Sequence, residues 1–273
     1  MPNHVQNKIT LTGNNDQLAE IAAKLNEHGF TFEDFVPMPK TLNIPAGGIT
    51  DDALYLYLTE LNGTEVSDIP TLFLPVIDKN GFAGIWDPTT KQIKPDAQTA
   101  WEKRVSSAQE YYDKLNDGDD DTIPTADAML EDTASKKAFM KLGETVYHNI
   151  LTYRAKDWYD WCCENWGTKW DAYEVDVDID LECDDPYITI NFQTAWGSPF
   201  PIFESILKQY PGVSLRGCWA DENIGSNCGE IVTANGKIAA HEPTDLDEAI
   251  RLACYVWGWD PDEYFNGDED EED

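Results

Sequence analysis

Residues 174–182 read Glu-Val-Asp-Val-Asp-Ile-Asp-Leu-Glu, and no other stretch of the chain points so directly to a fold class. The odd-numbered residues are all apolar and the even-numbered residues are all acidic, which is the two-residue period of a strand with one buried face. We expect that apolar face to join a core. We expect the other face to carry a straight row of five carboxylates, from Glu174, Asp176, Asp178, Asp180 and Glu182.

Further strands and several helices are predicted on both sides of this strand in the sequence. Alternating or apolar runs predict further strands over residues 5–12, 30–36, 187–193, 213–219 and 230–234. Helices are predicted after Gly13, from about Phe139 to about Gly167, from the Ser198-Pro199 N-cap, and from a capping box at Thr244 and Asp247. This order is typical of an α+β fold, a ferredoxin-like antiparallel sheet with helices packed on one face.

The periodicity weakens between residues 40 and 144, a stretch rich in proline and glycine. We interpret it as a partly helical insertion that interrupts the sheet domain. The predicted organisation is then a ferredoxin-like core from 1–39 and 145–240, an insertion over 40–144, a C-terminal helix within 241–265, and a disordered acidic tail over 266–273.

The charge balance excludes several classes of function. Lys and Arg number 19 against 52 Asp and Glu in 273 residues, which gives a formal net charge of −33. Nucleic-acid backbones and anionic membranes are bound through cations, so the composition argues against direct binding to either. No leader sequence or long apolar run is present, and the six cysteines form no C-x-x-C motif, so we expect reduced thiols in a cytoplasm.

Several motifs resemble a known family. They are Met1-Pro2-Asn3, the block Trp166-Gly167-Thr168-Lys169-Trp170, Phe192-Gln193-Thr194-Ala195-Trp196 followed by Ser198-Pro199, and Glu222 with Gly225. Together they resemble the YubB-type ferredoxin-like domain family of phage and conjugative-plasmid proteins, over roughly 1–39 and 145–240. His4 departs from the family, which usually has Trp there. The resemblance implies the fold, a mobile-element origin and a bacterial host cell, but no catalytic residue.

The acidic row suggests a function. Same-face residues of a strand lie about 6.7 Å apart, twice the 3.4 Å rise per phosphate of one DNA strand. The row can therefore imitate a nucleic-acid backbone and inhibit a host DNA- or RNA-binding defence protein by stoichiometric binding, with help from Asp119, Asp120 and Asp121 and from the acidic tail. A solvated face whose charges prevent sheets from aggregating explains the same pattern. Both interpretations stay open.

The alternative prediction is a small-ligand-binding regulatory module, because ferredoxin-like folds host many binding functions. Its pocket would be formed by Trp166, Lys169, Trp170 and Trp196. Aromatic rings in this region also suit core packing, and an exposed subset suits a protein interface.

Catalytic and metal-binding motifs are missing from the sequence. The four histidines lack zinc-site spacing, and the acidic runs lack the glycine and the terminal Glu of a calcium loop. No nucleophile elbow, phosphate-binding loop or dinucleotide fingerprint occurs. We therefore expect no enzymatic activity, no metal and no cofactor.

Overall fold

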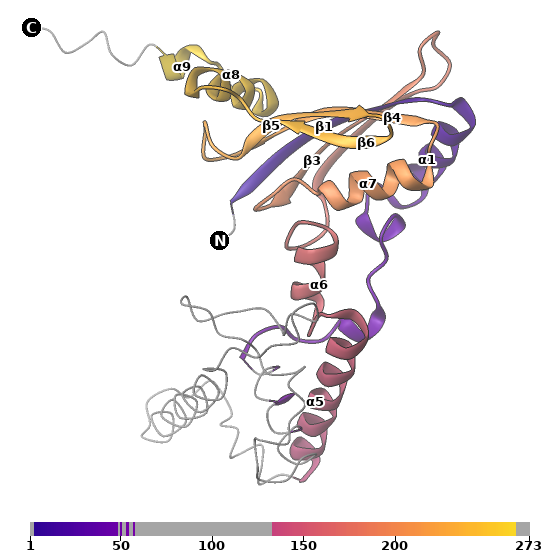
Figure 1. Ribbon diagram of the computed structural model, residues 1–273, viewed down its shortest axis with the longest axis vertical. Helices are drawn as coiled ribbons and strands as arrows, with labels where there is room; N and C mark the ends of the chain where they lie inside the picture. Colours follow the sequence, from indigo (N-terminus) through magenta and orange to yellow (C-terminus); the bar gives the residue numbers. More distant parts are fainter. Residues whose placement is uncertain (1–2, 49, 51–52, 55–56, 58–132, 266–273) are drawn as a thin grey trace, which may run out of the picture. The chain divides into compact units, whose positions relative to one another are not determined.

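The computed structural model describes residues 3–48, 50, 53–54, 57 and 133–265 (Figure 1). The chain divides into two compact units, Met1–Lys40 with Trp158–Asp273, and Thr41–Asp157. The predicted loop acids Asp119, Asp120 and Asp121 and the tail 266–273 lie outside the described residues. Among the helices that the structure describes, none combines the length and the apolar character that a membrane crossing requires.

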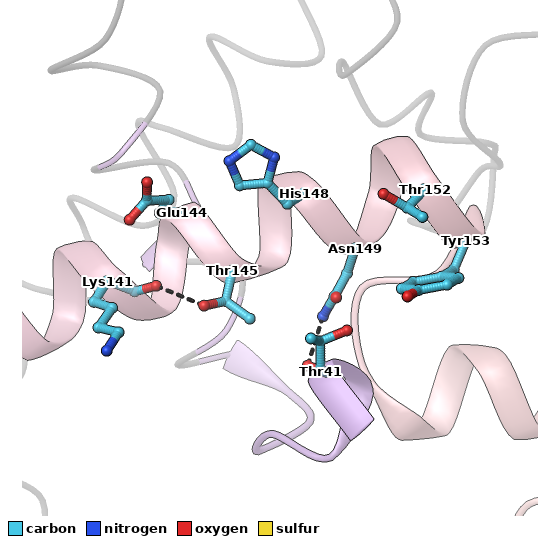
Figure 2. A pocket seen from close by; sticks show the side chains of 8 residues that line it. All are labelled: Thr41, Lys141, Glu144, Thr145, His148, Asn149, Thr152 and Tyr153. Carbon is cyan, nitrogen blue, oxygen red and sulfur yellow. Dashed lines mark hydrogen bonds between the residues drawn. The ribbon is translucent and has the colours of Figure 1, made fainter. Parts of the chain in front are cut away.

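The unit Thr41–Asp157 is described mainly through helix α5, Thr133–Tyr153. The buried side-chain amide of Asn149 donates to the carbonyl oxygens of Thr41 at 2.9 Å and Lys156 at 3.2 Å, which joins the segments before and after the helix. A pocket of about 280 Å³ lies along α5. Figure 2 shows Glu144 and His148 projecting from one side of α5, whereas Thr41 lies beside another side of the helix. The side chains that line the pocket therefore do not converge on one ligand position.

The predicted single helix from about Phe139 to about Gly167 is wrong. Helix α5 ends at Tyr153, Arg154 has a φ of 63°, and a separate helix, α6, runs over Trp158–Asn165. A left-handed residue cannot continue a right-handed helix. Apolar residues continue at helical spacing across the break, which is why the periodicity alone did not reveal it.

The other unit is built on a six-stranded antiparallel sheet with strand order β2-β3-β1-β4-β5-β6. The strands are β1 His4–Gly13, β2 Tyr173–Asp180, β3 Tyr187–Ala195, β4 Val213–Asp221, β5 Cys228–Ala234 and β6 Lys237–His241. The order β2-β3-β1-β4 is the ferredoxin-like arrangement, so the predicted α+β fold is confirmed. The added strand β6 pairs with β5 through the turn Asn235-Gly236, whose residues have φ values of 54° and 71°.

The main core lies between one face of this sheet and helices α1, Asn15–His28, and α7, Phe200–Gln209. It forms because the apolar residues of each strand alternate, while those of each helix recur at three and four. Phe192 of β3, for example, contacts Phe203 of α7 with ring centres 6.4 Å apart. The fully buried side chains of this core include Ile9, Leu11, Leu18, Ile21, Ile188, Ile190, Ile202 and Phe203.

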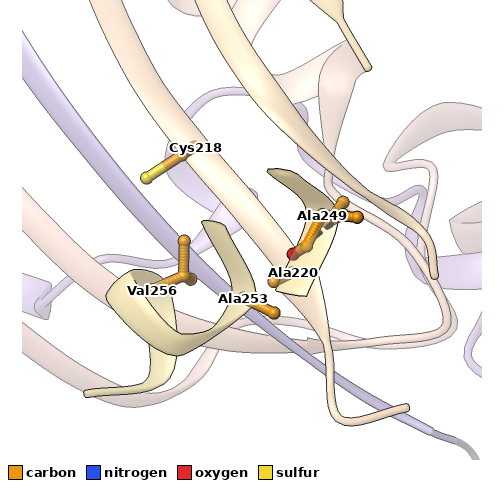
Figure 3. Close-up of a cluster of buried hydrophobic side chains, with 6 residues drawn as sticks. Cys218, Ala220, Ala249, Ala253 and Val256 are labelled. Atoms are coloured by element: carbon orange, nitrogen blue, oxygen red, sulfur yellow. Dashed lines mark hydrogen bonds between the residues drawn. The ribbon is translucent and has the colours of Figure 1, made fainter. Parts of the chain in front are cut away.

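Helix α8, Leu246–Trp257, adds a layer to the predicted single layer of helices. It lies on the opposite side of the sheet from α7 (Figure 1) and packs mainly on β4 and β5. This is possible because the even-numbered residues Cys218 and Ala220 of β4 are buried as well as its odd-numbered ones. The buried residues of this interface have small side chains (Figure 3), namely Cys218, Ala220, Cys228, Ala249, Ala253 and Val256. The partly buried Ile224, Leu252 and Trp257 pack against them.

The predicted strand over residues 30–36 is also wrong, because this segment contains the 3₁₀ helix η1, Phe32–Asp34. Phe30, Phe32 and Phe35 are all buried, and spacings of two and three residues cannot share one face of a strand. The backbone N–H of Phe32 donates to Asp171 Oδ1 at 2.8 Å, which fixes the segment without a strand partner. The unit Thr41–Asp157 is therefore inserted between α1 and β2, inside the first strand–helix–strand crossover.

Two helix starts lie one residue later than predicted. Pro199 is the N-cap of α7, and the predicted cap Ser198 has a buried hydroxyl without a hydrogen-bond partner. In α8 the cap is Asp245, whose side chain accepts from Glu248 N at 2.9 Å, while the Glu248 carboxylate accepts from Thr244 N at 2.8 Å. This is a reciprocal capping arrangement shifted by one position.

Candidate functional site

The first candidate feature is an acidic row on β2, which is an edge strand of the sheet. In the antiparallel register, Asp176 lies opposite Asn191, Asp178 opposite Thr189 and Asp180 opposite Tyr187. Directly opposed residues share a face. The three aspartates therefore point to one face, at the two-residue spacing predicted, and Asp176 and Asp178 are exposed. We call Asp176, Asp178 and Asp180 the acidic row.

The structure aligns three carboxylates in this row and not the expected five, because Glu174 and Glu182 are not part of it. Tyr173 lies opposite Gln193 while Asp176 lies opposite Asn191, so β2 contains one extra residue between them. Glu174 stands in this bulge with a φ of 48° and is out of line with the row. At the other end, Asp180 Oδ1 accepts from the backbone N–H groups of Glu182 and Cys183, both at 3.1 Å, and this turn ends the strand before Glu182.

The charge of the acidic row is not neutralised by a neighbouring strand. Asp178 Oδ2 accepts a hydrogen bond from Tyr187 Oη at 3.0 Å. This hydrogen bond, with the negative charge behind it, raises the pKa of Tyr187 above its ordinary value. Among the described residues, no Lys or Arg forms an ion pair with the three aspartates.

Cations lie on the same face, but further across the sheet. Asn191, which is opposite Asp176, is also opposite Lys8 of β1. Thr189, which is opposite Asp178, is opposite Thr10 of β1, and Thr10 is in turn opposite Arg216 of β4. Cys218 of β4 lies opposite both Lys8 and Glu230, and Lys8 Nζ lies 5.1 Å from the ring centre of Tyr255 of α8. Helix α8 therefore packs on the same face of the sheet as the acidic row.

The second candidate feature is an aromatic cluster around Lys169. The Lys169 ammonium lies 4.8 Å from the ring centre of Trp170, 5.1 Å from that of Trp196 and 5.9 Å from that of Tyr159. Trp196 follows β3 directly, is 44% exposed and has a φ of 73°. We call Tyr159, Lys169, Trp170 and Trp196 the aromatic cluster.

One of the four predicted ligand-pocket residues is not part of this cluster. Trp166 is only 4% exposed, its indole N–H donates to the carbonyl oxygen of Val36 at 2.8 Å, and its ring packs on Phe32. It belongs to the core. The other three, Lys169, Trp170 and Trp196, do come together, and Tyr159 of α6 joins them.

The backbone at Trp196 is fixed by a polar network around the buried Asp221. The Trp196 N–H donates to the carbonyl oxygen of Asn3 at 3.0 Å, and the Trp196 carbonyl oxygen accepts from Asn227 Nδ2 at 3.0 Å. Asn227 Nδ2 also donates to the buried Asp221 at 3.1 Å, and Asp221 accepts from Asn3 Nδ2 at 3.1 Å. Asp221 and Asn227 carry no motif signal in the sequence, unlike their neighbours Glu222 and Gly225.

Left-handed residues gather around this network. Outside glycine, the described residues with positive φ include Glu174, Trp196 and Asn227, at 48°, 73° and 44°. Such conformations are costly and persist where surrounding contacts hold them, often at functional sites. An exposed tryptophan in this conformation gains little from core burial, so its position points to a role at the surface.

The bulge is connected to the start of β1. His4 Nδ1 and Tyr173 Oη lie 2.5 Å apart, and the same hydroxyl donates to the carbonyl oxygen of Thr194 at 3.1 Å. The hydroxyl therefore accepts from His4 Nδ1–H. Burial, together with the nearby Glu222 and Glu174 carboxylates, raises the pKa of Tyr173 above its ordinary value, so this hydroxyl keeps its proton.

In the part of the chain that the structure describes, the His, Cys, Asp and Glu side chains form no group that could hold a metal ion. Burial raises the pKa of the Cys218 thiol to about 11, and it also raises the pKa values of Cys228 and Cys254. These thiols stay protonated near neutral pH, and the thiolate is the reactive form.

Part of the sheet domain is similar to a known family of domains. Residues 165–263, which include the acidic row and most of the aromatic cluster, match the family model described as the ferredoxin-like domain in Api92-like protein. A crystal structure of a protein Api92 from Yersinia pseudotuberculosis is similar to the chain at 12% identity and a TM-score of 0.36, covering 90% of this chain and 100% of that chain. No curated protein matches the chain. The chain thus contains, over residues 165–263, a ferredoxin-like domain similar to the one in Api92-like proteins.

Proposed function

We propose that the protein binds the basic, nucleic-acid-binding surface of a partner protein in place of the nucleic acid. The observation that carries this proposal is the acidic row, three carboxylates at even spacing on an edge strand with Asn, Thr and Tyr opposite them. Carboxylates about 6.7 Å apart match every second phosphate of a strand with a 3.4 Å rise. Side chains that hold phosphates can therefore pair with the row.

The charge of the whole molecule supports the same partner chemistry. A formal net charge of −33 repels nucleic acids and attracts basic surfaces. Long-range attraction accelerates encounter and is weakened by salt. The acidic row then supplies a specific spacing of charges, which long-range electrostatic attraction alone does not provide. The mechanism is stoichiometric and involves no chemical step or cofactor.

The resemblance to YubB-type phage and conjugative-plasmid proteins supports a partner in the bacterial host. A mobile element gains from inhibiting nucleic-acid-binding defence complexes such as restriction enzymes, CRISPR effectors or recombination nucleases. The proposal therefore places the protein in the host cytoplasm, bound to such a complex. The small-ligand alternative has less support, because Trp166 is buried in the core and cannot line the predicted pocket.

A charge-neutral variant of the row tests the proposal. In Asp176→Asn/Asp178→Asn/Asp180→Asn, each side chain keeps an acceptor oxygen, so the hydrogen bonds from Tyr187 Oη and Glu182 N can persist. A matched control, Glu20→Gln/Glu164→Gln/Glu204→Gln, removes the same charge from exposed positions on α1, α6 and α7.

The measurement is inhibition of nucleic-acid binding by partners captured from a host lysate, across a salt series. Exposed ion pairs contribute about 0.2–1 kcal/mol each, so loss of three should weaken inhibition about 3-fold to 100-fold. The control should change it less than twofold, and inhibition should fall steeply with salt. Equal effects of the two triple variants, or inhibition that is independent of salt, would overturn the proposal.

A further inference from the structure

We infer that the nucleic-acid-binding segment of the partner is an extended chain that adds to the edge strand β2 as a further strand, with basic side chains beside the acidic row and apolar side chains on the other face. This inference rests on the proposed function and names the kind of partner that the same site takes. It is carried by the open edge of β2, by the incomplete burial of its apolar face and by the position of α8.

The outer edge of β2 is available for strand pairing. In the described part of the chain β2 pairs with one strand, β3, from Asp176 opposite Asn191 to Asp180 opposite Tyr187. The backbone N–H and C=O groups of a strand point alternately to its two sides, so some of those in residues 176–180 point away from β3. Such an edge accepts an extended segment of another protein through main-chain hydrogen bonds.

The apolar face of β2 is covered less completely than that of its neighbour. Val177 lies opposite Ile190 and Ile179 opposite Ile188, so the members of each pair share the core face. Ile188 and Ile190 are fully buried, whereas Val177 and Ile179 are only half-buried. Helix α1 contacts this face mainly on β1 and β3. An apolar side chain on a strand beyond β2 would therefore bury the exposed parts of Val177 and Ile179.

The acidic row determines which residues suit the other face of the added strand. Same-face side chains recur about every 6.7 Å in any strand, so three alternate basic side chains come to lie beside Asp176, Asp178 and Asp180. Opposite charges stabilise such cross-strand pairs and like charges destabilise them. The row therefore selects a segment of alternating basic and apolar residues, and it rejects the β2 edge of a second copy of the chain.

The other edge strand, β6, lacks this preference for a basic segment. Over Lys237–His241 it reads Lys-Ile-Ala-Ala-His, without an acidic residue, and Lys237 is exposed. Charge therefore directs a basic segment to β2 and away from β6.

Helix α8 favours an extended partner over a folded groove. It packs on β4, β5 and β1, on the same face as the acidic row, and its Tyr255 lies over Lys8 of β1. With strands about 4.8 Å apart, a strand beyond β2 lies about 14 Å from β1 and is clear of the helix. A groove that closes over the whole face would meet α8. Arginine-rich segments that bind nucleic acids suit the edge instead, because they are disordered alone and fold on binding.

Two peptides of the same composition, each with blocked ends, test the inference on the full-length chain. Val-Lys-Val-Lys-Val-Lys-Val places all of its lysines on one face of a strand, and Lys-Lys-Lys-Val-Val-Val-Val does not. We expect the alternating peptide to bind about 5-fold to 30-fold more tightly in calorimetric titrations, because several cross-strand pairs differ between the two peptides.

Variants test the two faces of β2 separately. The charge-neutral variant of the row should bind the alternating peptide about 3-fold to 100-fold more weakly, and its matched control should bind within twofold of wild type. Val177→Thr/Ile179→Thr keeps β-branched side chains but removes apolar groups, and should weaken binding about 3-fold to 10-fold. The same changes on β5 and β6, Val232→Thr/Ile238→Thr, should leave binding unchanged.

Hydrogen exchange on the unmutated chain tests the inference even if a variant does not fold. The amides of residues 176–180 that point away from β3 should exchange rapidly in the free protein and slowly with the alternating peptide bound. The amides of β6 should not change.

Equal binding of the two peptides, or no added protection within 176–180, would overturn the inference. If binding still depends on the acidic row in that case, the proposed function stands with a partner of another shape. If the charge-neutral variant binds both peptides as tightly as its matched control, the proposed function fails as well.

Discussion

Tyr187 reports the charge of the acidic row, because its hydroxyl donates to Asp178. The hydrogen bond favours the protonated phenol, so the folded pKa lies above the ordinary value of 10.0. The associated stabilisation is complete below the unfolded pKa and is lost as pH rises through the raised folded pKa. We expect the ultraviolet titration difference between wild type and Tyr187→Phe to place this ionisation above pH 10. Asp178→Asn should lower it, and an ionisation at or below pH 10 in wild type would contradict the hydrogen bond.

At the scale of single residues, the sequence predicted those features of the site that depend only on nearby residues in the chain. The shared face of Asp176, Asp178 and Asp180 follows from the two-residue period of any strand. The bulge at Glu174 does not, since alternation in the sequence continues through it. The network around Asp221 was beyond prediction for a different reason: Asn3, one of its donors, is 218 residues away in the chain.

At the scale of elements, α8 is held on β1, β4 and β5 mainly through small buried side chains. The buried part of its interface is made of Ala, Cys and Val side chains, with Ile224, Leu252 and Trp257 packed against it and only partly buried. Leu246 and Tyr255 of α8 are both 63% exposed. Small side chains bury little apolar area, and stabilisation follows that area. We therefore expect α8 to detach from the sheet more often than the whole domain unfolds.

Thiol labelling measures this detachment, because α8 covers Cys218 and Cys228 and carries Cys254. These thiols should react at a common rate under native conditions, faster than global unfolding allows. Ala249→Gly lowers helix stability by about 1 kcal/mol and should raise that rate about fivefold. The matched control Ala23→Gly, at an exposed position of α1, should leave the rate unchanged. Labelling only at the rate of global unfolding would show that α8 does not detach separately.

Periodicity predicted β1, β3, β4 and β5 because each alternates along most of its length and has a partner on both sides. It did not predict the segment around η1, where three phenylalanines are buried at unequal spacing and the backbone bonds to Asp171. It also did not place α8 on the second face. That placement depends on Cys218 and Ala220, which are small enough for a helix to approach. The sequence of a strand with small residues on one face does not show whether a helix covers that face.

At the scale of the whole molecule, self-repulsion should make stability depend on salt. A formal net charge of −33 favours expanded states when charges are unscreened. The screening length falls from about 30 Å at 0.01 M salt to about 8 Å at 0.15 M. We expect the thermal unfolding midpoint to rise by several degrees over this range of sodium chloride. A midpoint that stays constant or falls would mean that specific ion pairs outweigh the repulsion.

The position of β1 has a consequence for biosynthesis. This strand lies in the middle of the sheet, yet Val5 meets Thr194, which is 189 residues further along the chain. On a translating ribosome, β1 and α1 emerge long before β3 and β4 exist, and pairing over such separations is slow. The apolar residues Val5, Ile9 and Leu11 therefore lack the neighbouring strands β3 and β4 throughout the synthesis of the inserted unit. A nascent chain halted before residue 187 should bind chaperones through its first strand and release them once β3 has been made.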